Sequence, residues 1–169
     1  GTQGLADAFA KMRYPFDSKE AMQLNKEIFA TIYYSAMQKS ISIAKKDGPY
    51  SSFKGSPLSE GKFQHNLWEI EPIKQVGTEE VNHKILDWDT LRSDVMEFGA
   101  RNSLLTALMP TASTSQIMGN NECIEPFTSN IYLRRVLAGE FIVINKFLLR
   151  DLKHLGLWNK EMKNTLIYY

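Results

Sequence analysis

The apolar residues near the start of the chain recur every three or four positions, which predicts two helices. The first helix carries Leu5, Phe9 and Met12 on one face and ends before Pro15, because the residue before a proline avoids helical geometry. The second begins near Asp17, which can form a capping box with Glu20, and ends at the run 45–49, KKDGP. Its apolar stripe comprises Leu24, Ile28, Phe29, Ile32, Tyr33, Ala36, Met37, Ile41 and Ala44. Such a stripe is typical of core packing, so we place no chemistry on it.

The next stretch lacks a clear period. Residues 48–61 are rich in Gly, Pro and Ser and predict a loop with one helical turn at 56–59. Residues 62–70 alternate imperfectly, which favours a short extended segment. Residues 71–84 are polar and irregular, and we expect a surface insertion over 71–86 that is irregular or disordered.

A helix followed by a buried strand comes next. Leu91, Val95 and Phe98 predict a helix over 89–98 that ends at Gly99. The apolar run 103–108 lacks polar alternation, which predicts a strand covered on both faces, as in a parallel sheet flanked by helices. In such α/β units, ligands bind at the carboxyl ends of the strands.

The C-terminal part predicts a hairpin and two helices. Residues 131–136 and 140–144 flank Ala138-Gly139 as two paired strands. Asn145 can cap a helix over 147–154 that Gly156 ends, and 160–168 predicts another amphipathic helix.

The turn after the predicted strand is the candidate binding site. Pro110 leads into Thr111-Ala112-Ser113-Thr114-Ser115, after which a short helix is expected from Gln116. The opening turn of a helix presents unpaired N–H groups that suit an anion, and small side chains let phosphate oxygens approach the backbone. From the residues alone, an ordinary Ser/Thr helix cap explains the same pattern.

Composition narrows the classes of function. The chain has 169 residues, 43% of them hydrophobic, and 20 basic against 19 acidic side chains give a formal charge of +1. That balance gives no field for nucleic acid, and no apolar run is long enough to cross a membrane, so we expect neither partner. One cysteine cannot form an internal disulfide, which fits a reducing, cytoplasmic setting. The three histidines show no metal-ligand spacing, so no metal site is expected.

Several segments in order along the chain resemble one family. They are GLADAF at 4–9, MRYPF at 12–16, RNSL at 101–104, LMPTASTSQI at 108–117, GNNECIEP at 119–126, TSNIY at 128–132, RRVLAGEF at 134–141 and LLRDL at 148–152. Together they resemble the large subunit of class I ribonucleotide reductase, of eukaryotic or viral type. The first residues resemble the middle of that subunit, so we expect a piece of a longer protein.

The resemblance implies a fold and an activity. The fold would be a single partial domain over 1–169, the later part of a ten-stranded α/β barrel, mostly helical with a few strands. The complete enzyme would reduce ribonucleoside diphosphates by radical chemistry, with Pro110, Thr111, Ala112, Ser113 and Thr114 holding the substrate diphosphate. No catalytic residue would lie in this piece, which is expected to be inactive alone.

The resemblance also implies partners and cofactors. A radical would come from the metal centre of a separate small subunit, two large subunits would form a homodimer, and thioredoxin or glutaredoxin would act as reductant. ATP and deoxynucleoside triphosphate effectors would bind elsewhere, so no cofactor is expected within these residues.

Cys123 is not expected to be catalytic, although residues 121–125 satisfy the Asn-x-Cys-x-Glu pattern of the family's radical cysteine. That motif precedes GLADAF in the family, whereas this one follows the candidate phosphate turn, so Cys123 is interpreted as a small, partly buried residue. Arg134 and Arg135 are expected to form surface ion pairs and are left out of the site.

Two other classes of function remain open at this point. A P-loop phosphotransferase is disfavoured because Gly-x-x-x-x-Gly-Lys-[Ser/Thr] does not occur. A non-catalytic interaction module would use the aromatic helix over 18–47 to dock a partner.

Overall fold

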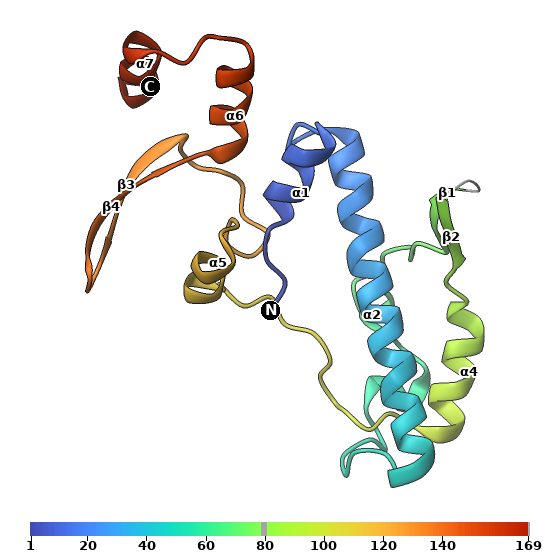
Figure 1. Cartoon of the computed structure of the whole chain (residues 1–169). Helices are drawn as coiled ribbons and strands as arrows, with labels where there is room; N and C mark the ends of the chain where they lie inside the picture. The colour runs from blue at the N-terminus through green and yellow to red at the C-terminus, as the bar shows by residue number, and fades with distance from the viewer. Residues whose placement is uncertain (79–80, 169) are drawn as a thin grey trace. The chain divides into compact units, whose positions relative to one another are not determined.

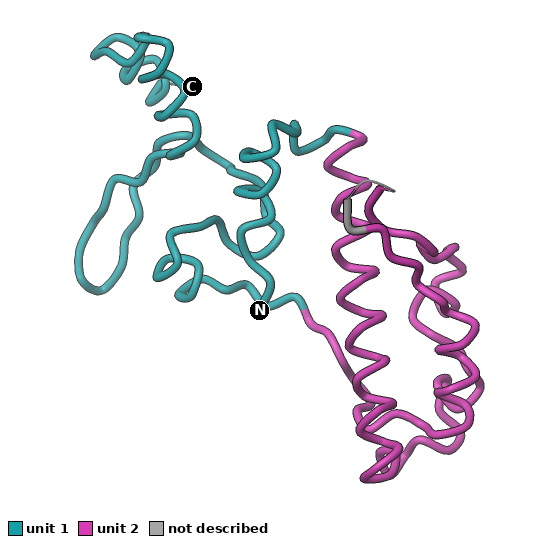
Figure 2. The backbone as a smooth tube through the Cα atoms, turned by 45° about the vertical axis from the view of Figure 1, so that its right-hand side comes forward, with its two compact units in different colours: residues 1–18, 108–169 teal, residues 19–107 magenta. Residues whose placement is uncertain are grey.

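A computed structural model describes residues 1–78 and 81–168, and within them the chain is mostly helical, as predicted, with two antiparallel hairpins (Figure 1). The elements are α1 Leu5–Met12, α2 Lys19–Asp47, η1 Pro57–Glu60 (a 3-10 helix), α3 Gln64–Leu67, β1 Gln75–Thr78, β2 Val81–Ile85, α4 Trp88–Phe98, α5 Ala112–Met118, β3 Ile131–Val136, β4 Gly139–Ile144, α6 Lys146–His154 and α7 Lys160–Tyr168. Two compact units are distinguished in Figure 2: residues 1–18 with 108–169, and residues 19–107. The single partial domain expected over 1–169 stays a prediction.

The unit of residues 19–107 has its core between α2 and α4. The β1–β2 hairpin and the loop through η1 and α3 complete it. The buried core residues are Tyr34, Met37, Ile41, Phe63, Val76, Leu86, Trp88, Leu91, Val95 and Ala100. The C-terminal half of the predicted α2 stripe therefore packs in the core, whereas Ile32 is 37% exposed.

Trp88 lies at the centre of this core and is 5% exposed. Its indole Nε1–H donates to the carbonyl of Ile73 at 2.7 Å. Its ring centroid lies 5.1 Å from that of Tyr34, 5.8 Å from that of Phe63 and 4.8 Å from that of His65. Burial lowers the pKa of His65, and the positive charge of Arg92 adds to the effect. The half-buried ring of His65 thus packs against Trp88, where burial disfavours its protonated form.

The unit of residues 1–18 and 108–169 contains α1, α5, the β3–β4 hairpin, α6 and α7. The hairpin runs in register from Ile131 opposite Ile144 to Val136 opposite Gly139. The side-chain oxygen of Asn145 accepts from the N–H groups of Phe147 and Leu148, which caps α6. These contacts confirm the predicted hairpin and the predicted cap.

The helices predicted from periodicity are confirmed with small shifts of their ends. α2 begins at Lys19, two residues after Asp17, and η1 confirms the single turn expected at 56–59. α4 has Asp87 as its N-cap and ends at Gly99, which lies in a positive-φ conformation. Periodicity and capping act over one or two turns, which is why the sequence alone locates these elements.

The buried strand predicted over 103–108 is wrong for this structure. No regular element covers these residues, and the side chains of Leu104 and Leu108 are 88% and 52% exposed. A strand is stabilised by hydrogen bonds to a neighbouring strand and by cover on its faces. Within the described residues, the two hairpins pair only with themselves. An apolar run without a pairing partner has no reason to become a strand.

Two further expectations are corrected between 62 and 86. Residues 62–70 contain the helical turn α3, in which the Phe63 N–H donates to the Asn66 side chain at 2.9 Å, so the extended segment is wrong. The segment expected to be irregular forms the β1–β2 hairpin, although residues 79–80 lie outside the described part. Val76 of β1 and Leu86 are buried in the core, which explains the ordering. That 71–86 is an insertion stays a prediction.

Candidate phosphate-binding turn

The candidate turn is the N-terminal end of α5. The helix begins at Ala112, four residues before the expected Gln116, so the Ser/Thr run forms its first turn. N–H groups in a first turn have no acceptor within their own helix, because the carbonyl four residues earlier lies outside it. Ala112, Ser113 and Thr114 are all exposed. These exposed residues therefore carry N–H groups without a helical acceptor, the kind of donor that an anion can bind.

Thr111, the residue that leads into α5, has an unusual backbone conformation. It is the N-cap of α5 and has φ 58°, ψ 24°, in the left-handed region. β-Branched residues are rare there, because the side chain crowds the backbone. Its carbonyl accepts the N–H of Ser115 at 2.9 Å, and its Oγ1 accepts the N–H of Cys123 at 2.9 Å. The Thr111 hydroxyl keeps its own hydrogen available as a donor.

The other hydroxyls of the run differ in availability. Ser115 is fully buried, and its Oγ donates to the Ala112 carbonyl at 3.3 Å, so it cannot reach a ligand. Thr114 donates to the side chain of Gln3 at 2.9 Å and would have to change partner to bind an anion. Within the described residues, the exposed Ser113 hydroxyl makes no hydrogen bond. Ser113 is thus the side chain most ready to bind.

Pro110 and the four residues after it are adjacent in the chain, and the structure keeps them together at one exposed site. Pro110 is exposed at the end of the irregular segment that leads into Thr111. The site carries no charged side chain, so any attraction for an anion comes from backbone dipoles and hydroxyls.

The segment that follows α5 supports the turn, and sequence reasoning missed this role. The N–H of Asn121 donates to the carboxylate of Asp7 at 2.6 Å, and its carbonyl accepts from Gly4 at 3.0 Å. Asp7 is 6% exposed, an unusual burial for an acid. An aspartate placed among Leu5, Ala6, Ala8 and Phe9 is the sequence signal that could have found it.

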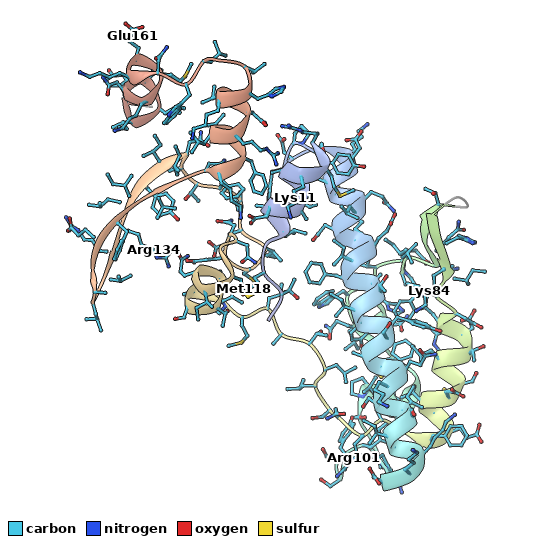
Figure 3. The ribbon with its side chains drawn as sticks, in the orientation of Figure 1. Lys11, Lys84, Arg101, Met118, Arg134 and Glu161 are labelled. Carbon is cyan, nitrogen blue, oxygen red and sulfur yellow. The ribbon has the colours of Figure 1, made fainter. Side chains whose placement is uncertain are left out.

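Arg134 and Arg135 form the ion pairs expected of them and Cys123 is buried, while the absence of a catalytic role for Cys123 stays a prediction. Cys123 is a buried free cysteine, and its backbone N–H donates to Thr111 Oγ1. Arg134 pairs with Glu122 at 2.8 Å, and this hydrogen bond raises the pKa of Arg134; Arg135 pairs with Glu140 at 2.6 Å. Figure 3 labels Arg134 on β3 and Met118 at the end of α5. Both guanidinium groups are thus occupied by carboxylates.

A cavity of about 310 Å³ lies at the far end of α5 from the candidate turn. Its lining includes two ion pairs, one between Arg134 and Glu122 and the other between Lys146 and Asp7. Because each cation already has a carboxylate partner, this cavity offers an anion little attraction. Over residues 1–78 and 81–168, no cluster of three His, Cys, Asp or Glu side chains is arranged to hold a metal, and no helix is long and apolar enough to cross a membrane.

Comparison with known proteins decides the family. The model of the family described as "Ribonucleotide reductase, barrel domain" matches residues 1–169. The chain belongs to the ribonucleotide reductase barrel family. The large subunit of ribonucleoside-diphosphate reductase from Trypanosoma brucei brucei is 56% identical over 170 residues, which cover 99% of this chain and 20% of that protein. The corresponding proteins of Neurospora crassa and Acanthamoeba polyphaga mimivirus are 54% and 52% identical, over 99% and 100% of this chain and 17% and 18% of theirs.

The reductase match confirms the resemblance to eukaryotic and viral large subunits and the expectation of a partial barrel domain. The chain spans about a fifth of the length of these relatives. The interaction-module alternative loses its main support, because Tyr34, Met37 and Ile41 of the aromatic helix are buried in the core of their own unit.

Proposed function

We propose that residues 110–114 hold the diphosphate of a ribonucleoside diphosphate in a reductase large subunit. The observation that carries the proposal is the exposed first turn of α5, where the N–H groups of Ala112, Ser113 and Thr114 have no acceptor within their own helix. The hydroxyls of Thr111 and Ser113 add donors, and Pro110 restricts how the chain enters the turn. The relatives' name, ribonucleoside-diphosphate reductase, supports a diphosphate as the anion.

The role of this turn would be positional. An uncharged phosphate-binding turn performs no chemistry, but it fixes the ribose relative to the group that reacts with it. Such orientation contributes strongly to the reaction rate. We infer that the reactive radical cysteine would lie outside residues 1–169 and that the radical would originate on a separate small subunit. The same reasoning extends the proposal to a large-subunit homodimer, to thioredoxin or glutaredoxin as reductant, to ATP and deoxynucleotide effectors bound elsewhere and to a cytoplasmic location.

The exposed segment before the turn fits this proposal. Leu104, Leu108 and Met109 are 88%, 52% and 57% exposed, which is costly for apolar side chains. We infer that other parts of a longer reductase would cover these side chains beside the turn.

Calorimetric titration of the chain with ADP, and separately with ATP and magnesium, tests the proposal. We expect weak binding of the diphosphate, because other parts of the reductase would complete the pocket. An Ala112→Glu variant should bind ADP about tenfold more weakly or worse, which corresponds to about 1.4 kcal/mol. A carboxylate in the first turn suits the helix dipole, so this variant should fold, but it opposes a second anion.

Ala112→Gln is the matched control, since it adds similar bulk without charge, and it should bind ADP like the unmodified chain. Equal affinities of the two variants would contradict the proposal. Preferential binding of ATP with magnesium, unaffected by either variant, would indicate a different nucleotide site.

A further inference from the structure

Asp7 has an arrangement that the phosphate turn alone does not explain. It lies in the first turns of α1, and its side chain is 9% exposed. One oxygen accepts the N–H of Asn121 at 2.6 Å, and the other lies 3.1 Å from the Lys146 ammonium. A buried carboxylate needs partners of this kind: the Asn121 N–H bonds one oxygen, and the charge of Lys146 offsets the other, which accepts no hydrogen bond from the described residues. Its contacts reach a segment more than a hundred positions later in the sequence.

The segment 119–123 is held from both sides by the start of the chain. Asn121 gives its N–H to Asp7 and receives the N–H of Gly4 on its carbonyl at 3.0 Å. Gly4 has φ +80°, a left-handed conformation that glycine adopts without strain. Lys146 also donates to the Gly119 carbonyl. Hydrogen bonds to Asp7, Gly4 and Lys146 therefore hold the segment in place at Gly119 and Asn121.

The same segment holds both ends of α5. The N–H of Asn120 donates to the Ser115 carbonyl at 3.0 Å, and the N–H of Cys123 donates to Thr111 Oγ1 at 2.9 Å. Thr111 and Cys123 both have positive φ, at 58° and 42°. Two strained non-glycine residues joined by one hydrogen bond persist only where their surroundings fix them. The conformation of Thr111, and with it the direction of the amide groups of 112–114, depends on where Cys123 is placed.

We propose that Asp7 is a positioning residue for the candidate phosphate turn. Its carboxylate fixes Asn121, which places the Cys123 amide against Thr111, and Thr111 then aims the first-turn N–H groups of α5. We call this chain of contacts the Asp7–Thr111 network. The coupling of Asp7 to the turn stands on the contacts alone, whereas its use in binding a diphosphate rests on the proposed function.

An Asp7→Ala variant of the full chain tests the coupling by residue-resolved amide hydrogen exchange. We expect exchange at Ser115 and Cys123 to become about tenfold faster, because the bonds that protect these amides lose their support. Exchange in α7, which is not part of the Asp7–Thr111 network, should stay unchanged. Asp7→Asn keeps an oxygen acceptor for Asn121 and should stay near the unmodified chain. Asp151→Ala is the matched control, since it removes a carboxylate paired with Arg13 in the same unit without touching the network.

A second variant keeps the test valid if Asp7→Ala does not fold. Thr111→Val preserves shape but removes the oxygen that Cys123 bonds, so it should speed exchange at Cys123 by a similar factor, while Thr111→Ser should not. The proposal is overturned if exchange at Ser115 and Cys123 is unchanged in Asp7→Ala. It is also overturned if exchange rises equally throughout the unit, because Asp7 would then be a general stabilising residue.

Titration with inorganic pyrophosphate separates this inference from the proposed function. We expect Asp7→Ala to weaken pyrophosphate binding about tenfold, in step with the loss of protection. If the unmodified chain does not bind pyrophosphate but the turn still responds to Asp7→Ala, the proposed function is wrong and the coupling stands. If both chains bind equally while exchange differs, Asp7 does not position the turn for binding.

Discussion

Replacing Trp88 with phenylalanine tests the account of the core in the unit of residues 19–107. The substitution removes the Nε1–H that donates to Ile73 at 2.7 Å and leaves that partly buried carbonyl without its partner. A carbonyl left unpaired in this way costs about 1–3 kcal/mol. The smaller ring also leaves space at a site that is 5% exposed, which adds to the loss. We expect a total loss of about 2–3 kcal/mol in the free energy of unfolding.

Urea unfolding followed by far-UV circular dichroism measures this loss, because α2 alone supplies 29 helical residues to the signal. With a typical urea dependence of about 1–3 kcal/mol per molar, the midpoint should fall by roughly 1 M. Trp68→Phe is the matched control: Trp68 is 65% exposed, and its replacement should change stability by less than about 0.5 kcal/mol. Coincident midpoints for the two variants would refute the assignment of Trp88 to the centre of the core.

Three further predictions concern other parts of the chain. Because burial lowers the pKa of His65 below its usual 6.5, the folded state resists its protonation, so stability present at neutral pH should be lost as the pH falls through 6.5 and below. Urea midpoints measured between neutral and mildly acidic pH should show this fall, and a His65→Phe variant should show less of it. Asn145→Ala removes the cap of α6 and should lower the stability of its unit by about 1 kcal/mol, as measured by amide exchange in that helix. Cys123→Ser should leave ADP affinity unchanged in calorimetry, since Cys123 contacts Thr111 through its backbone; a clear loss would assign a role to the thiol.

Local patterns account for most of the helices. The stripe of α2, the Asn145 cap of α6 and the Gly99 end of α4 are each encoded within a few residues, and each is present. The β3–β4 hairpin was equally predictable, because the residues of its turn lie between two strands that pair with each other. In these cases the interactions that stabilise an element lie inside the element or beside it in sequence.

Segments that depend on distant partners were predicted poorly. The run 103–108 has the composition of a buried strand, but no described segment pairs with it. Residues 71–84 look irregular until Val76 and Leu86 are seen in the core. Pairing and burial of this kind depend on the tertiary arrangement, which composition does not contain.

Only the part of the candidate site that depends on neighbouring residues could be predicted from the sequence. The small hydroxylated residues 111–114 mark a possible anion site through their chemistry alone. The left-handed Thr111, the early start of α5 and the support from Asp7 result from contacts across the chain, and no local pattern encodes them. The family resemblance supplied the identity of the anion, which the geometry of a neutral turn leaves open.

The central claim is that backbone N–H groups at the start of α5 receive a diphosphate. Amide nuclear magnetic resonance of the ¹⁵N-labelled chain during titration with ADP tests it most directly. The account predicts that the largest, saturable shifts occur at the amides of Ala112, Ser113 and Thr114, and that adenosine without phosphate does not produce them. Saturable shifts elsewhere in the chain, with these three amides unmoved, would contradict it.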